Sequence, residues 1–241
     1  MKRLFEPIRK MIPSRLKQVV RQKLGLPTAV GARWRMANGV EPLSYEWGGD
    51  RGNALFAVYV GEFLTEFRED IRGHCLEFNN DAYTSAFGGS QVEKLDILHQ
   101  DNSNPQATIW GDLTRENNLP SDTFDCIICT HVLHLIFEVW KAVPEIYRML
   151  KPGGVLLVAV PQVSMCDPSW GECYRYTEEG LRRMLGLAFR EGDVLVKAYG
   201  NSLISAGQIR GLTAEEFTPE EMNYHDPRFG VEVCARAVKG G

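Results

Sequence analysis

Two histidines, His131 and His134, stand where a ligand crevice is expected. They follow an apolar run, Phe124 to Cys129, in which polar and apolar residues do not alternate. Such a run is typical of a strand buried on both faces of a parallel sheet, and residues just past its carboxyl end face the ligand. A neutral imidazole there can take a proton from an attacking hydroxyl group. His131 is therefore a candidate base; the alternatives are that it lines the crevice or caps the next helix.

A later stretch, residues 162–176, combines aromatic and charged side chains that suit a polyol. It contains Trp170, Glu172, Tyr174 and Arg175. Aromatic rings can stack on a sugar, while a carboxylate and a guanidinium can hydrogen-bond its hydroxyl groups. These four residues are candidate substrate contacts. The alternative is that they pack a long connection.

The cysteines do not indicate a metal site. Cys126 and Cys129 have the spacing of metal and redox motifs, but no second Cys or His pair at ligand spacing accompanies them. Within a strand, side chains three residues apart face opposite ways, so both are predicted to be core residues. Because four of the six cysteines lie in apolar strand-like runs, reduced thiols and a cytoplasmic location are expected.

The elements that must position these residues form a strand, a helix and a second strand. Apolar residues recur at helical spacing from Val139 to Leu150, and Lys151-Pro-Gly-Gly154 then stops the predicted helix. A second apolar run follows from Val155 to Val160. Two buried strands joined by a helix make a right-handed crossover unit of a parallel sheet.

The same stretch resembles a known family. Asp122-Thr-Phe-Asp125, an apolar strand, Val132-Leu-His134, Leu150-Lys-Pro-Gly-Gly154 and another apolar strand are similar to strands four and five of class I S-adenosylmethionine-dependent methyltransferases. The closer similarity is to their small-molecule type 11 branch, and it extends over roughly residues 51–239. The resemblance implies an α/β fold: a Rossmann-like, seven-stranded, mostly parallel sheet with helices on both faces and an antiparallel last strand.

The loop after the first predicted strand, Cys75 to Phe78, departs from the family pattern. Phe78 and Asn79 replace the usual glycines. The loop is similar to that of a narrower branch, often found with sugar-modifying enzymes, in which Asp or Asn, then Tyr-Thr and Phe-Gly-Gly, replace them. Asn79, Asn80 and Asp81 can adopt the left-handed backbone that glycine usually supplies. The alternative is a degenerated site that binds nothing.

The resemblance implies S-adenosylmethionine as the cofactor. Asp96, at the end of the predicted strand Val92 to Ile97, would accept both ribose hydroxyls, unless it is only a turn residue. Asp112 would face the adenine amino group, unless it is only a helix cap. The predicted cofactor contacts are Glu77, Phe78, Asn79, Asp81, Tyr83, Thr84, Asp96, Ile97, Asp112, Leu113 and Thr130.

His134 matches a histidine that often has a positioning role in this branch. It therefore joins His131 as a candidate catalytic residue, although positioning of the nucleophile supplies most of the rate in direct methyl displacement. His225 and Asp226 are a second and weaker place for a base.

Charge is distributed unevenly along the 241 residues. The chain has a net charge of −4, whereas residues 1–25 hold eight Lys or Arg side chains and one Glu, a net +7. We expect a basic amphipathic extension and linker at residues 1–39 and a methyltransferase domain at 40–241. The extension fits peripheral membrane or protein contact, a helix docked on its own domain, or a flexible tail. The acidic remainder disfavours nucleic acid as a partner.

These observations predict a cytoplasmic S-adenosylmethionine-dependent methyltransferase, with membrane association as one role open to its basic extension. The expected reaction is O-methylation of a sugar, glycosylated metabolite or other small molecule or glycan by direct displacement. The alternative from another class is a non-catalytic protein that keeps the methyltransferase fold as a binding or scaffold module in a biosynthetic complex. The replaced glycines favour that alternative.

Overall fold

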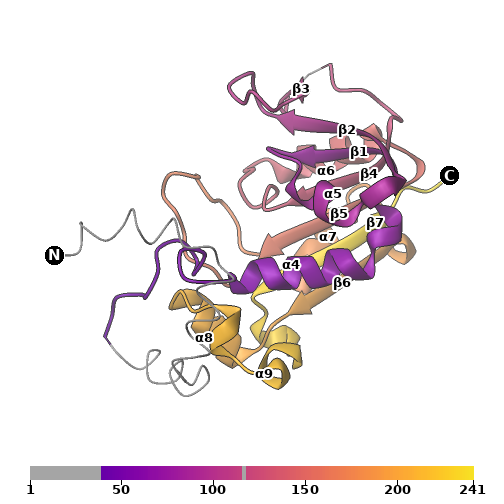
Figure 1. Ribbon diagram of the computed structural model, residues 1–241. Coiled ribbons are helices and arrows are strands. Elements are labelled where there is room, and N and C mark those ends of the chain that lie inside the picture. Colours follow the sequence, from indigo (N-terminus) through magenta and orange to yellow (C-terminus); the bar gives the residue numbers. More distant parts are fainter. Residues whose placement is uncertain (1–38, 116–117) are drawn as a thin grey trace.

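The computed structural model describes residues 39–115 and 118–241 (Figure 1). The predicted extension at residues 1–39 lies outside this range except for Gly39. The strands are β1 (Gly73–Phe78), β2 (Val92–His99), β3 (Ile109–Trp110), β4 (Phe124–Thr130), β5 (Leu150–Pro161), β6 (Val194–Tyr199) and β7 (Glu232–Val238). The α-helices are α4 (Leu55–Glu66), α5 (Ala82–Phe87), α6 (Val139–Met149), α7 (Glu178–Leu185), α8 (Ser202–Ile209) and α9 (Pro219–Asn223).

The seven strands form one sheet in the order β3-β2-β1-β4-β5-β7-β6. The pairs among β1 to β5 are parallel, and β7 runs antiparallel to both β5 and β6. The predicted Rossmann-like sheet with an antiparallel last strand is confirmed. Because β7 is reversed, its first residue lies at the edge of the sheet where the parallel strands end.

Two hydrophobic clusters cover the two faces of the sheet. One joins α6 and α7 to the sheet, and the other joins α4 and α8 to the opposite face. Cys129 belongs to the first cluster and Cys126 to the second, as alternation along β4 requires. Both thiols are fully buried. The central strands read as continuous apolar runs because helices cover both of their faces.

The helix α4 buries one apolar face. Leu55, Tyr59, Val60, Phe63 and Leu64 are its buried residues. Their spacing of three and four positions puts them on one face of the helix. This face packs on the cluster that contains α8, so α4 closes one side of the sheet.

Two strands extend further than the apolar runs indicate. β2 continues to His99, two residues past the predicted end at Ile97. β5 begins at Leu150, so Lys151-Pro-Gly-Gly154 lies inside the strand. Gly153 within this stretch has φ 79°, a left-handed backbone conformation that glycine adopts without steric cost. The length of β2 decides which of its residues reaches the carboxyl edge.

None of the helices in residues 39–115 and 118–241 has the length and apolar character that a membrane crossing requires.

Candidate active site

Two adjoining cavities lie at the carboxyl edge of the parallel strands. The larger has a volume of about 610 Å³ and the smaller about 230 Å³, and both are lined by Leu135 and Trp170. The larger cavity is lined by Phe78, Asn79, Leu98, His99, Gln100, Gly111, Asp112, Leu113, Thr114, Arg115, Val132, Leu135, Ile136, Phe137, Glu138, Ser169 and Trp170. The smaller is lined by Trp47, Phe56, His131, His134, Leu135, Pro161, Ser164, Trp170, Glu172 and Glu232.

The end of β1 forms one wall of the larger cavity. Asn79 has φ 68°, the left-handed conformation expected of it, and its N–H donates to the Leu98 carbonyl at 3.1 Å. Asn80 is not among the described residues with positive φ, and Asp81 has φ −106°. One asparagine therefore supplies the left-handed residue of this turn.

Asp112 brings a carboxylate to the opposite wall. Its Oδ1 accepts from the Thr114 N–H at 2.8 Å and the Thr114 hydroxyl at 2.7 Å, and Arg115 lies 3.2 Å from Oδ2. Burial raises the pKa of Asp112, but the Thr114 and Gln100 hydrogen bonds and the Arg115 charge lower it by more, so the net shift is downward. Asp112 is thus an ionised hydrogen-bond acceptor on the cavity wall.

His131 and Glu232 form a pair in the smaller cavity. His131 follows β4 directly, has φ 54°, and its N–H donates to the Ala159 carbonyl at 2.8 Å. The His131 Nε2 lies 2.8 Å from Oε1 of Glu232, the first residue of β7. The side chain of Glu232 is 1% exposed, and its Oε2 has no hydrogen-bond partner among the described residues. The reversed direction of β7 brings this carboxylate to the carboxyl edge.

The pKa values of the two histidines are shifted in opposite directions. Burial lowers the pKa of His131, but the charge and hydrogen bond of Glu232 raise it by more, and Glu172 adds to the rise. Burial, followed by the charges of His131 and Arg175, lowers the pKa of His134 to about 3. The rings lie edge to face, with centroids 6.1 Å apart. His131 therefore holds a proton more readily than an ordinary histidine, while His134 stays neutral.

Glu77 does not line either cavity. Its two oxygens accept from the N–H groups of Tyr83 at 3.0 Å and Thr84 at 2.7 Å, which anchors the first turn of α5 to β1. Tyr83 stacks on Phe87, and Thr84 is buried. Asp81 is exposed beside them. The four residues thus support the loop from behind, whereas Phe78 and Asn79 line the larger cavity.

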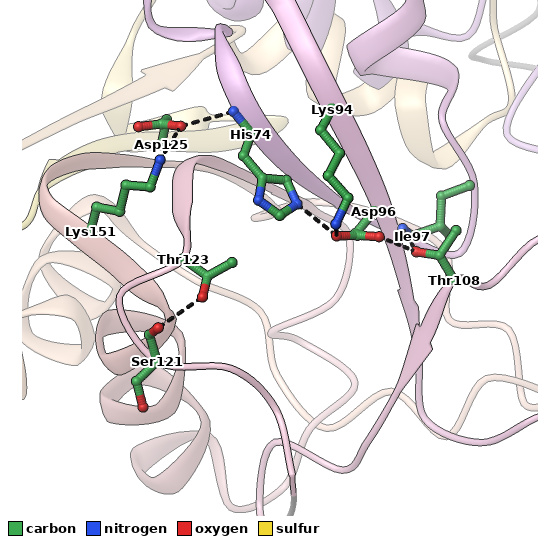
Figure 2. A network of polar contacts seen from close by, with 9 residues as sticks. All are labelled: His74, Lys94, Asp96, Ile97, Thr108, Ser121, Thr123, Asp125 and Lys151. Carbon is green, nitrogen blue, oxygen red and sulfur yellow. Dashed lines mark hydrogen bonds and ion pairs between the residues drawn. The ribbon is translucent and has the colours of Figure 1, made fainter.

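The structure corrects the position predicted for Asp96. Because β2 runs on to His99, Asp96 pairs with Leu76 inside the sheet and lies three residues before the strand end. Figure 2 shows His74 and Lys94 converging on its carboxylate, at 2.6 and 2.9 Å, while Thr108 donates to the other oxygen at 2.8 Å.

This network belongs to the amino-terminal side of the sheet. The N–H of His74, near the start of β1, also donates to Asp125 near the start of β4. Neither Asp96 nor Ile97 lines a cavity. The end of β2 instead presents His99 and Gln100 to the larger cavity.

The residues predicted to contact the substrate, in the loop at 162–176, fall into two groups: some line a cavity and others hold the loop in place. Trp170 lines both cavities and Glu172 lines the smaller one. Arg175 pairs with Glu172 and donates to the Met165 carbonyl at 3.1 Å. The Tyr174 hydroxyl donates to the Phe137 carbonyl at 2.7 Å. Arg175 and Tyr174 therefore hold the loop, and Thr130 ends β4 without lining either cavity.

Sequence reasoning missed several cavity residues, and Glu232 is the most consequential. It lies 101 positions from His131 and begins a run that reads as an ordinary strand. Trp47 and Phe56 come from the segment before β1, where local spacing carries no sign of a ligand. A carboxylate at the start of a reversed last strand is the signal that could have indicated Glu232.

Comparison with known proteins adds a family match and one curated relative. Residues 81–158 match the family model described as methyltransferase domain. The ubiquinone/menaquinone biosynthesis C-methyltransferase of Enterobacter sp. (strain 638) is 32% identical over an alignment of 84 residues. The alignment covers 26% of this chain and 34% of the relative. The chain thus spans about a third of the length of that relative.

Solved structures share the fold at low identity. A SAM-dependent methyltransferase from Archaeoglobus fulgidus is 13% identical, with a TM-score of 0.52 over 81% of this chain and 100% of its own. Phosphoethanolamine N-methyltransferase 2 of Haemonchus contortus, in complex with phosphomonomethylethanolamine and S-adenosylhomocysteine, is 14% identical, with a TM-score of 0.51 over 96% of this chain and 61% of its own. The described domain has the class I methyltransferase fold.

Proposed function

We propose that this protein is an S-adenosylmethionine-dependent methyltransferase that methylates a hydroxyl group of a sugar, glycosylated metabolite or similar small molecule. The observation that carries the proposal is the junction of the two cavities at the carboxyl edge, with His131 on the smaller one. The match to a methyltransferase domain at residues 81–158 supports it.

The residues of the larger cavity fit this cofactor. A volume of about 610 Å³ lies within the usual range for small-molecule sites. Apolar surface for the adenine ring of the cofactor comes from Phe78, Leu98 and Leu113. The ionised Asp112 supplies a hydrogen-bond acceptor for the adenine amino group. The turn at Asn79 brings backbone to the cavity wall. When bound, the cofactor supplies an electrophilic methyl group.

His131 supports the choice of a hydroxyl acceptor. The carboxylate of Glu232 only accepts hydrogen bonds when ionised, so Nε2 of His131 carries the proton of the neutral ring. The lone pair is then on Nδ1, which can take the hydroxyl proton as the oxygen attacks. His134 stays neutral beside it. The named relatives methylate carbon or nitrogen, so the proposal of oxygen rests on His131.

An acceptor screen tests the proposal. Purified protein, S-adenosylmethionine and a panel of glycosides and polyols should yield S-adenosylhomocysteine together with products heavier by one methylene, detected by mass spectrometry. His131→Asn keeps a residue that tolerates positive φ but removes the base. It should lower kcat by about 10²-fold or more while leaving cofactor affinity unchanged. Wild-type activity in His131→Asn, or methylation only at carbon or nitrogen, would contradict the proposed role.

A further inference from the structure

We propose that the smaller cavity selects acceptors carrying a protonated amine beside the methylated hydroxyl, such as amino sugars or cyclic amino alcohols. The amine would be held by Glu232 and the surrounding aromatic rings. This inference rests on the proposed function and specifies its acceptor class.

The charges around the smaller cavity favour a cation. Its ten described lining residues include two carboxylates, Glu172 and Glu232, and neither lysine nor arginine. Glu172 is paired with Arg175, which does not line the cavity. Among the described residues Glu232 forms an ion pair with His131, so its charge is uncompensated whenever that ring is neutral. An anionic acceptor, such as a phosphate or carboxylate, would meet like charge in a confined space.

Glu232 has unused hydrogen-bonding capacity. One oxygen accepts from His131, and the other has no partner in the part of the chain that the structure describes. A buried carboxylate oxygen left unsatisfied is costly, and a charge-assisted N–H donor would satisfy it. Because Glu232 itself lines the cavity, a bound acceptor can provide that donor.

The proposed role of His131 as a base gives a second reason to expect a positively charged acceptor. His131 must be neutral to accept a proton, yet a neutral His131 leaves Glu232 without a counter-charge. An ammonium group on the acceptor supplies it. Since the ammonium and the imidazolium compete for the same carboxylate, amine binding displaces a proton from His131. Glu172 and His134 are charged or titratable groups beside His131, Arg175 lies near His134, and Tyr83 and Cys234 lie near Glu232.

Aromatic rings complete the environment of a cation. Trp47, Phe56 and Trp170 line the cavity, and the Phe56 ring meets His131 edge to face with centroids 5.0 Å apart. Ring faces attract ammonium groups once water is removed. A neutral diol of the same shape would gain less, since its hydroxyl groups carry no charge to offset Glu232.

Calorimetric titration with a matched pair of probes tests the inference. Aminocyclohexanol, with adjacent amine and hydroxyl, is compared with the corresponding cyclohexane diol in the presence of saturating S-adenosylhomocysteine. We expect the amine to bind at least about tenfold more tightly. Its binding should release protons, measured from the dependence of the heat on the ionisation enthalpy of the buffer.

Two variants test whether the preference for the amine depends on Glu232. Glu232→Gln should remove the preference for the amine. Glu62→Gln, which deletes an equal charge on α4 outside the cavity, should keep it. If Glu232→Gln does not fold, proton release by the wild-type protein still decides the matter.

Several outcomes would overturn the inference: equal binding of both probes, no binding of the amine, or amine binding without proton release. Absence of S-adenosylhomocysteine binding would overturn the proposed function instead. The same probe comparison without cofactor would then still test whether the smaller cavity prefers an amine.

Discussion

At the scale of single residues, His131 combines two unusual features. Its backbone adopts φ 54°, which is uncommon for a residue with a side chain, and its ring is paired with a fully buried carboxylate. Strained backbones persist where the surroundings hold them and concentrate at functional sites. Here the Ala159 carbonyl and Glu232 hold His131 from two different strands.

This pairing predicts how His131 titrates. Because the Glu232 carboxylate stabilises the imidazolium, Glu232→Gln should lower the pKa of His131, so the ring loses its proton at lower pH than in the wild type. His134, with a pKa of about 3, should show no titration above about pH 5. NMR titration of the ring carbons measures both. An unchanged or raised His131 pKa in Glu232→Gln would contradict the assignment.

The residue scale also marks the limit of sequence reasoning. His131 could be predicted, because it follows a recognisable buried strand. Glu232 was missed, because its role emerges only when the implied reversal of the last strand is combined with the pairing of β7 and β5, which brings Glu232 opposite Pro161. Nothing local to residue 232 indicates that neighbour.

At the scale of elements, most strands and helices follow from apolar patterns, while strand lengths do not. β1, β4 and α6 lie where the runs and periodicity predict them. Lys94 and Asp96 made β2 appear to end early, because polar residues inside a strand resemble a boundary. The hydrogen bonds that Lys94 and Thr108 donate to Asp96 let the strand continue. The error placed Asp96 at the carboxyl end of β2, whereas it lies three residues before that end.

We therefore expect Asp96 to stabilise the fold. Burial raises its pKa, but hydrogen bonds from Lys94, Thr108 and His74 lower it by more. Asp96→Asn should reduce the free energy of unfolding at pH 7 by about 1.5–3 kcal/mol, the usual worth of hydrogen bonds to a charged group. Since the folded-state pKa is depressed, this contribution is present above the unfolded pKa of about 3.9 and is lost as the pH falls through the folded pKa.

Urea denaturation at pH 7 and pH 3 measures this effect. The difference between wild type and Asp96→Asn should shrink at the lower pH. Glu93→Gln, which alters an exposed carboxylate on the same strand, serves as the control and should change stability little. Equal stability of Asp96→Asn and wild type at pH 7 would refute the structural role.

At the scale of the whole molecule, a buried ion pair holds the segment before α4 to the segment after α8. Arg51 donates to the Gly211 carbonyl at 2.6 Å and lies 2.7 Å from Glu216, with both charged side chains 7% exposed. This contact fixes the chain around Trp47 and Phe56, which line the smaller cavity. The smaller cavity is therefore assembled from segments far apart in the sequence, whereas local motifs mark only part of the larger one.

The larger cavity is proposed to be a working cofactor site. Calorimetric titration with S-adenosylhomocysteine tests it most directly. We predict binding in the micromolar range, roughly −8 kcal/mol. Asp112→Ala should weaken binding at least about tenfold, and Asp96→Asn should leave it within about twofold, since Asp96 lies outside the cavity. Folded, ligand-free protein that gives no heat and no thermal shift would contradict the account and favour a non-catalytic scaffold.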